Sequence, residues 1–519
     1  MRFNRGVNPV ELLRSDLSAA GYTVPALAGL WGPDAAEALH RDQRVPARRA
    51  LDALRAGRSD LPAVAVLADL FVLGRAVTLP ELAVAFPALG VQGAADLGFV
   101  SIDGGQARAA LDLRPYSFED TAGAGSWWIA SDLGELATGG ALPEDHVLGV
   151  GGASLTLSGL MFQAPVDSVL DLGTGCGIQA LHAARHARRV VATDISERAL
   201  AIAAMNATLN GFENIEFRLG SLFEPVAGER FDRIVSNPPF VITPRVDGVP
   251  SYEYRDGGMV GDALVEAVLT GVAEHLEPGG TAQLLGNWEY HDGDDGLPRV
   301  RAWLDSVGLD YWIVEREVLS AALYAETWIR DGGTTPATPD FDRLYAAWLD
   351  DFAERGVSGV GFGYVVLRMP RAGASVTLTR TEQQHGPLGD IEPRGVGAHL
   401  EAGLAASDWL AGTDDAALSA ARLTVAGDVT EERHYWPGDE NPTAMVLRQG
   451  GGFGRAVTLD TALAALIGAC DGELSVGAIC AALAQLLEVD ETALTADLLP
   501  AVRELVRGGI LSPSSSSRG

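Results

Sequence analysis

The spacing of apolar residues varies along the chain and is most regular in the middle of the sequence. Between residues 167 and 240, short apolar runs typical of strands alternate with stretches in which apolar residues recur every three or four positions, as in helices. Strands that alternate with helices form a parallel sheet covered by helices. The pattern therefore predicts an α/β domain of the Rossmann-like kind in this region.

The first of these strands ends in a turn that contains three glycines. The apolar run 168–172 is followed by Gly173, Gly175 and Gly177, and a helical pattern begins at Ile178. Glycine suits such a turn because a ligand can lie against bare backbone and because the turn can adopt positive φ. The new helix directs free N–H groups toward a bound carboxylate. The third glycine comes one residue too early for the dinucleotide fingerprint, which weakens an NAD-binding interpretation.

Two later strands also end in residues that can bind a ligand. The run 189–194 ends in Asp194, about 20 residues past the first strand, where an acid reaches a ribose diol. The run 231–236 is followed by the tetrad Asn-Pro-Pro-Phe at 237–240. Ligands of open parallel sheets bind at the carboxyl ends of the strands, so these motifs are expected at one site.

Taken together, the three motifs resemble those of class I S-adenosylmethionine (SAM) methyltransferases that methylate a planar nitrogen. The motifs are D-L-G-T-G-C-G at 171–177, T-D-I-S at 193–196 and S-N-P-P-F at 236–240. Two branches are similar: the glutamine methyltransferases of peptide-release factors, and the N-methyltransferases of adenine or guanine amino groups in RNA and DNA. The resemblance covers roughly residues 150–370 and implies a seven-stranded core whose last strand is antiparallel.

The resemblance implies SAM as the cofactor and a set of residues that bind it. These residues are Asp171, Gly173, Thr174, Gly175, Gly177, Asp194, Ile195, Ser221, Leu222 and Asn237. The sequence departs from the family after the third strand, where Ser221 stands in place of the usual acid that holds the adenine amino group. Adenine recognition is therefore expected to rely on Ser221 and on backbone groups near Leu222.

By the same resemblance, Asn237, Pro238 and Phe240 carry the catalysis. The side-chain carbonyl of Asn237 and the backbone carbonyl of Pro238 accept hydrogen bonds from the target NH₂. Both acceptors concentrate electron density on a nitrogen whose lone pair is delocalised, and they direct it at the sulfonium methyl. The ring of Phe240 is expected to lie flat on the planar substrate.

Further substrate contacts are implied at the third residue of the tetrad and in the loop 252–261, which resembles the substrate-covering loop of the glutamine methyltransferases. The residues are Pro239, Tyr254 and Arg255. An ordinary surface loop before the helix expected at 262–275 is the alternative interpretation of this loop.

Charge changes the expectation about the substrate. The 519 residues include 38 basic side chains, all of them arginine, and 69 acidic side chains. The net charge of the chain is therefore −31. A large nucleic-acid footprint needs a basic surface, so this balance disfavours one without excluding a local contact. Three scattered cysteines indicate a reducing cytoplasm, and the absence of a long apolar run excludes a membrane span.

The flanking regions are predicted to be separate domains. We expect a helical, winged-helix-like substrate-recognition domain at 1–115, a connector with strands at 116–150, the methyltransferase domain at 151–370, an α+β domain ending in a winged-helix-like unit at 371–511, and a disordered tail at 512–519. The helices of the first domain carry arginines at 41, 44, 48, 49, 55 and 58. These offer a contact face for RNA or an acidic protein, although interleaved aspartates favour a solvated surface.

Several local expectations can be checked against the structure. A short strand is predicted at 153–157, over the cofactor pocket. Trp127 and Trp128 are expected to pack between domains. His182 and His186 stand four residues apart like a metal pair but lack a third ligand, so a solvent-facing pair and no metal site are expected.

The sequence thus predicts a cytoplasmic SAM-dependent N-methyltransferase. Its target is a planar NH₂, either the exocyclic amine of an RNA base or the glutamine amide of a protein. The missing basic surface favours a protein or a small molecule, whereas the tetrad and the N-terminal module favour RNA, and both remain open. A small-molecule N-methyltransferase and a non-catalytic SAM-binding scaffold are the alternatives.

Overall fold

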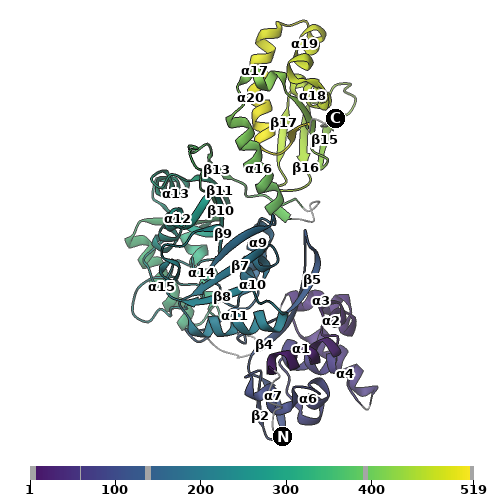
Figure 1. Cartoon of the computed structure of the whole chain (residues 1–519), viewed down its shortest axis with the longest axis vertical. Helices are drawn as coiled ribbons and strands as arrows, with labels where there is room; N and C mark the ends of the chain where they lie inside the picture. Colours follow the sequence, from purple (N-terminus) through teal and green to yellow (C-terminus); the bar gives the residue numbers. More distant parts are fainter. Residues whose placement is uncertain (1–7, 42, 59, 135–141, 390–394, 515–519) are drawn as a thin grey trace. The chain divides into compact units, whose positions relative to one another are not determined.

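The computed structural model describes residues 8–41, 43–58, 60–134, 142–389 and 395–514. The chain divides into two compact units (Figure 1). The first contains residues 1–158 and 164–373, and the second contains residues 159–163 and 374–519. Among the described residues, no helix has both the length and the apolar character needed to cross a membrane.

The first unit begins with a helical part that carries a small sheet. Its helices are α1 (Pro9–Ala19), α2 (Val24–Trp31), α3 (Pro33–His40), α4 (Val45–Ala56), α5 (Ala63–Leu67), the π-helix η1 (Ala68–Val72), α6 (Leu79–Ala85) and α7 (Gly90–Asp96). The sheet has the order β1-β3-β2, from β1 (Val77–Thr78), β2 (Val100–Asp103) and β3 (Gln106–Ala109). Gly104 and Gly105 close the hairpin between β2 and β3 with φ of +54° and +80°. The winged-helix assignment stays a prediction.

A long hairpin, β4 (Asp112–Asp120) with β5 (Gly123–Ser131), joins this helical part to the central domain. The Trp128 indole Nε1 donates to the Tyr22 carbonyl at 2.7 Å, and the Trp128 amide donates to Asn210 Oδ1 at 3.0 Å. Trp127 is buried against His182, with ring centres 4.8 Å apart. The predicted packing role of the tryptophan pair is confirmed.

The predicted solvent-facing position of His182 is wrong. The hairpin covers this histidine, Tyr116 shares a 3.0 Å hydrogen bond with its Nε2, and burial lowers its pKa to about 4. His186 instead lies 3.2 Å from the Asp120 carboxylate. No pattern in the sequence indicates the contact between Tyr116 and His182, because the two residues lie 66 positions apart.

The central sheet of the first unit has seven strands in the order β11-β12-β10-β9-β6-β7-β8. They are β6 (Val166–Leu172), β7 (Ala187–Asp194), β8 (Ile215–Leu219), β9 (Phe231–Ser236), β10 (Leu276–His291), β11 (Asp310–Ser320) and β12 (Val357–Arg368). Neighbours from β10 to β8 are parallel, and β12 is antiparallel to β10 and β11. The predicted α/β, Rossmann-like core is confirmed. Its strand order reverses beside β6, where such sheets bind ligands.

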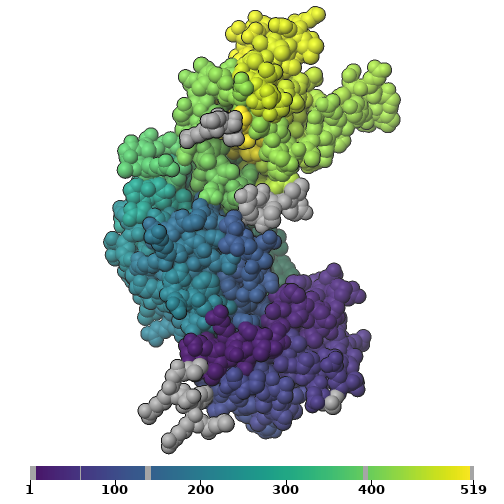
Figure 2. All heavy atoms as spheres, turned by 45° about the vertical axis from the view of Figure 1, so that its right-hand side comes forward, coloured from purple at the N-terminus to yellow at the C-terminus, as the bar shows by residue number. Residues whose placement is uncertain are grey.

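Helices pack on this sheet and position its strand ends. They are α9 (Gly152–Leu160), α10 (Ile178–Ala184), α11 (Glu197–Asn210), the 3-10 helix η2 (Glu224–Val226), α12 (Ala263–His275), α13 (Gly296–Asp305), α14 (Ala321–Asp331) and α15 (Pro339–Glu354). The Ser196 hydroxyl caps α11, and Gly211 ends it with φ of +78°. The helix α1 packs against α11, where Figure 2 shows the dark purple N-terminal atoms against the blue-green core.

The strand predicted at 153–157 is wrong, because this segment belongs to α9. Alternation of serine or threonine with leucine produced the strand expectation. In the structure, Leu157 and Leu160, three residues apart, are buried, whereas Leu155 is exposed. Burial at helical spacing therefore overrides the local alternation.

The second unit has its own apolar core around residues such as Leu423, Leu466, Cys480 and Val502. Its helices are α16 (Gly395–Ala411), α17 (Asp415–Ala420), α18 (Thr461–Gly468), α19 (Val476–Leu487) and α20 (Glu491–Arg507). Its strands are β13 (Thr379–Gln383), β14 (Arg422–Val425), β15 (Val429–His434), β16 (Ala444–Gln449), β17 (Ala456–Leu459), β18 (Asp471–Ser475) and β19 (Leu511–Pro513). Two of its sheets have the orders β18-β14-β19 and β15-β16-β17, and the winged-helix assignment here also stays a prediction.

Candidate functional site

A cavity of about 370 Å³ lies at the carboxyl ends of β6, β7 and β9. It gathers most of the residues that the sequence motifs singled out. Those that line it are Gly173, Thr174, Gly175, Asp194, Ile195, Ser221, Leu222, Asn237, Pro238, Pro239 and Tyr254. The folding of a parallel sheet thus brings three separate motifs to one place, as expected from the strand ends.

The glycine turn has the backbone conformation that the sequence predicted. Gly173, Gly175 and Gly177 have φ of +73°, +54° and +87°, which side chains rarely adopt. The Thr193 carbonyl holds the turn by accepting hydrogen bonds from the amides of Gly173 and Thr174 at 3.0 and 2.9 Å. A Cβ on Gly177 would approach Ala203 to 3.0 Å. The turn therefore needs glycine both for its conformation and for its packing on α11.

Asp194 is held at the end of β7 by backbone amides. Its Oδ2 accepts from the Gly175 amide at 2.9 Å, and its Oδ1 accepts from the Ser196 amide at 3.0 Å. Burial raises the pKa of this carboxyl above its usual value. The carboxylate therefore lines the cavity in a fixed orientation, with lone pairs left for a ligand hydroxyl.

Asp171 lies behind the cavity, not in its lining. It is 1% exposed, and its Oδ2 accepts from the Thr174 hydroxyl at 2.5 Å. Burial raises the pKa of this carboxyl to about 7. Its Oδ1 is buried and has no hydrogen bond from the described part of the chain. A positive charge placed beside the glycine turn would favour the ionised form.

Asn237 follows β9, lines the cavity and has an unused acceptor. Its Oδ1 is buried, and no described residue donates a hydrogen bond to it. A buried carbonyl without a donor is costly, so it is suited to a ligand that brings an N–H group. The Ser236 hydroxyl anchors the strand end by donating to the Leu172 carbonyl at 2.7 Å.

Two predicted substrate residues lie outside the cavity lining. The ring of Phe240 packs against Phe362, with centres 5.6 Å apart, and near Trp328. The Arg255 side chain is buried over the Tyr252 ring and donates to Asp331 at 2.6 Å. Stacking of Phe240 on a substrate and contact by Arg255 stay predictions.

The backbone after β8 carries an unusual conformation at the cavity. Leu222 lines the cavity with φ of +48°, in the left-handed region that non-glycine residues seldom occupy. Such local strain is concentrated at functional sites. Contact of the ligand with Ser221 and with backbone near Leu222 stays a prediction.

Sequence reasoning missed His146, which lies in the loop before α9. It is 3% exposed and lines the cavity, and its ring centre is 5.6 Å from that of Tyr254. Burial lowers the pKa of its imidazole, so it is neutral near pH 7. No periodicity or motif in the sequence marks this residue. Within the described residues, no cluster of three or more potential metal ligands occurs.

Comparison with known proteins finds family models that match three segments of the chain. Residues 151–291 match the family model described as Methyltransferase small domain. Residues 19–110 and 401–513 match models described as Domain of unknown function (DUF7059) and Domain of unknown function (DUF7782). The first match confirms the methyltransferase resemblance of the motifs and of the central fold.

Two relatives illustrate the similarity of this segment. The release factor glutamine methyltransferase of Xylella fastidiosa is 41% identical over 150 residues, which cover 27% of this chain and 52% of the relative. The ribosomal protein uL3 glutamine methyltransferase of Bradyrhizobium diazoefficiens is 35% identical over 168 residues, covering 30% of this chain and 52% of the relative. The chain spans about half the length of these curated relatives.

Proposed function

We propose that this protein is a SAM-dependent N-methyltransferase that methylates the side-chain amide of a glutamine in a protein. One observation carries the proposal: Asn237 lines the same cavity as the glycine turn, and its buried Oδ1 receives no hydrogen bond from the described residues. An amide NH₂ supplies the missing donor. The methyltransferase match of residues 151–291 supports SAM as the methyl donor.

The residues around the cavity fit this cofactor. The glycine turn would offer bare backbone to its amino-acid part, Asp194 would offer lone pairs to its ribose, and Ser221 and the backbone at Leu222 would hold its adenine. When bound, SAM supplies an electrophilic methyl group on a positively charged sulfur. The ionised form of Asp171, behind Thr174, complements that charge.

The tetrad prepares the attacking nitrogen. Asn237 Oδ1 accepts one N–H of the amide, and the backbone carbonyl of Pro238 accepts the other. These contacts hold the nitrogen lone pair toward the methyl group and disfavour its delocalisation into the amide. The two prolines restrict the backbone, so the carbonyl keeps its direction. The methylated amide then releases its extra proton without a strong base, because a protonated amide is highly acidic.

A protein substrate is favoured over RNA by the charge of the cavity and by the relatives. The described lining contains Asp194, Glu253 and Asp256 and no arginine, which disfavours a phosphate backbone. The relatives are named for glutamine methylation of a release factor or a ribosomal protein. We place the reaction in the cytoplasm, which agrees with three free cysteines at 176, 470 and 480.

The test uses radiolabelled SAM, the full-length protein and a cell lysate. The expected result is label in macromolecules that protease treatment releases and nuclease treatment does not. Label lost to nuclease identifies RNA or DNA as the acceptor, and label confined to small molecules identifies a small-molecule enzyme. Binding of SAM without any transfer identifies a scaffold. Each of these three outcomes overturns the proposal.

Asp194→Asn is expected to weaken SAM binding. Hydrogen bonds to a charged acceptor contribute about 1.5–3 kcal/mol, so losing the charge should raise Kd about 10- to 100-fold. Isothermal calorimetry measures the change. Asp167→Asn is the matched control, because the Asp167 side chain is 78% exposed at the start of β6. A Kd for Asp194→Asn equal to that of the control contradicts the assignment.

The affinity for SAM is expected to fall as the pH drops below about 7, the value to which burial raises the pKa of Asp171. Below this pH the free protein holds a proton on Asp171, and a bound cation must displace it. If each SAM that binds displaces one proton from Asp171, the affinity falls by up to about tenfold for each pH unit below this value. Calorimetric titrations between pH 6 and 8 measure the slope. Asp171→Asn should flatten the profile, and an unchanged slope in this variant assigns the titration to another group.

A further inference from the structure

Two residues that line the cavity have a buried polar side-chain atom without a hydrogen bond. They are Asn237, through Oδ1, and His146, through Nδ1, and no other described lining residue has such an atom. The proposed methyl transfer uses Asn237 and gives His146 no role. Because a polar side chain buried without hydrogen bonds costs stability, both residues are suited to a polar ligand.

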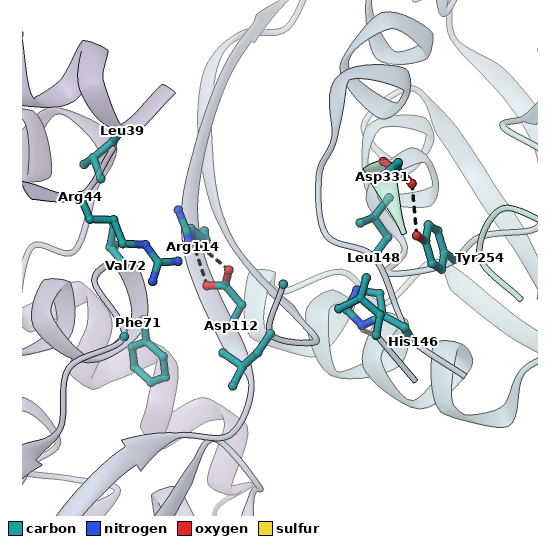
Figure 3. A pocket seen from close by; sticks show the side chains of 14 residues that line it. Leu39, Arg44, Phe71, Val72, Asp112, Arg114, His146, Leu148, Tyr254 and Asp331 are labelled. Atoms are coloured by element: carbon teal, nitrogen blue, oxygen red, sulfur yellow. Dashed lines mark hydrogen bonds and ion pairs between the residues drawn. The ribbon is translucent and has the colours of Figure 1, made fainter. Parts of the chain in front are cut away.

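His146 lies where this first cavity meets a second one, of about 410 Å³. His146, Leu148 and Tyr254 line both cavities, whereas Asn237 lines only the first. Figure 3 shows the His146 and Tyr254 side chains next to each other on one side of the second cavity. A ligand that extends from Asn237 into the second cavity therefore passes the imidazole of His146.

The segment that carries His146 is anchored, so the imidazole has a fixed place. The Val147 amide donates to Asp132 Oδ2 at 2.9 Å, and the Asp132 amide donates to the Val147 carbonyl at 3.0 Å. The His146 amide donates to the Pro143 carbonyl at 3.2 Å. The Tyr254 ring packs on the imidazole with ring centres 5.6 Å apart and planes at 71°. A ligand thus meets an imidazole that is already oriented.

The imidazole has hydrogen-bonding capacity left for a ligand. Its pKa is lowered by burial, so it is neutral near pH 7, with one donor and one acceptor nitrogen. Asp132 Oδ2 lies 4.0 Å from Nδ1, beyond hydrogen-bond distance, and its negative charge favours a proton on Nδ1. The acceptor is then Nε2, which matches a ligand group that brings an N–H.

The target residue of the proposed reaction brings such a group. The two N–H bonds of its side-chain amide would go to Asn237 and to the Pro238 carbonyl, and its main chain has one more N–H. The main chain lies several bonds away from the reacting nitrogen, so it is expected away from the tetrad. His146 lies on the boundary with the second cavity, where Asn237 does not reach.

We propose that the imidazole of His146 accepts a hydrogen bond from the main-chain N–H of the target glutamine, while Asn237 holds its side-chain amide. The inference rests on the proposed function. It makes His146 a residue that selects glutamine within a polypeptide, because neither the exocyclic amine of an RNA base nor a simple carboxamide has a main-chain N–H at that position.

The test compares two small substrates. One is N-acetyl-glutamine methylamide, and the other is its analogue in which an ester oxygen replaces the main-chain N–H of the glutamine. Transfer from radiolabelled SAM by the full-length protein gives kcat/KM for each. In the wild type we expect the ester to lower kcat/KM about tenfold, because it leaves a buried acceptor unpaired. In His146→Ala the ester should cost about twofold or less, because that acceptor is gone.

The ratio of the two substrates is taken within one variant, so partial unfolding of His146→Ala lowers both rates equally and leaves the ratio unchanged. His146→Gln keeps a side-chain acceptor and should retain part of the ester effect. His434→Ala is the matched control, because His434 belongs to the second unit and 60% of its side chain is exposed. This control should show the full effect of the ester.

Three results overturn the proposal and leave the proposed function standing. The first is equal kcat/KM for the two substrates in the wild type. The second is an ester effect that persists in His146→Ala, which assigns the N–H to another acceptor of the lining, such as Glu253. The third is a capped glutamine that stays unlabelled while proteins of the lysate are labelled. If neither is labelled, the proposed function fails, and this inference fails with it.

Discussion

Asn237→Ala is expected to lower kcat for methyl transfer by about 100- to 1,000-fold, the usual cost of removing one preorganised polar contact to a reacting group. The Asn237 carbonyl sits at the end of β9 with its Oδ1 buried and without a donor among the described residues, so it is ready to accept an N–H of the substrate. Asn237 is also expected among the residues that bind SAM, so the affinity for SAM is measured beside kcat to separate the effect on the attacking nitrogen from a loss of cofactor binding. Single-turnover transfer of labelled methyl groups and calorimetry with SAM measure the two quantities.

Two further variants make this result specific. Asn237→Asp keeps an acceptor oxygen at the same place and should retain more activity than the alanine variant. Asn441→Ala changes an exposed asparagine that also precedes a proline, in the other unit of the chain, and should behave as wild type. If Asn237→Ala turns over as fast as Asn441→Ala, the tetrad does not prepare the nitrogen and the proposed mechanism is wrong.

Trp288→Ala is expected to destabilise the first unit by about 3–5 kcal/mol, the range for removing a large aromatic side chain from a core. The indole is fully buried on β10, and its Nε1 donates to Glu315 at 2.8 Å. A Cβ on Gly361 or Gly363 of β12 would come within 2.3 or 2.6 Å of this ring. The ring thus fills the space that these glycines leave, and its removal creates a cavity and takes a donor from a buried carboxylate.

Urea unfolding followed by far-ultraviolet circular dichroism measures this loss as a lower midpoint of the first unit's transition. Trp436→Ala is the matched control, because Trp436 is 69% exposed in the second unit. Its effect should stay within about 0.5 kcal/mol. Equal midpoints for the two variants would show that the Trp288 ring does not support the sheet.

Much of the central site could be predicted because its motifs determine the backbone conformation of only a few neighbouring residues. The glycine turn needs positive φ at Gly173, Gly175 and Gly177, and no other residue supplies it as easily. Asp194 and Asn237 follow strands, and parallel strands end at one edge of a sheet. Expectations that used only neighbouring residues failed where distant segments cover the chain, as at His182 and at 153–157.

The sequence by itself determined the parallel core, the turn conformation and the strand ends that carry Asp194 and the tetrad. Each of these features depends on the backbone conformation of a few neighbouring residues, and the residue types set that conformation. Only the tertiary structure decided that His146 meets Tyr254, that Phe240 packs away from the cavity lining, and that a second cavity adjoins the first. Such contacts join segments far apart in the chain, and packing of the whole unit sets them without leaving a periodic signal in the sequence.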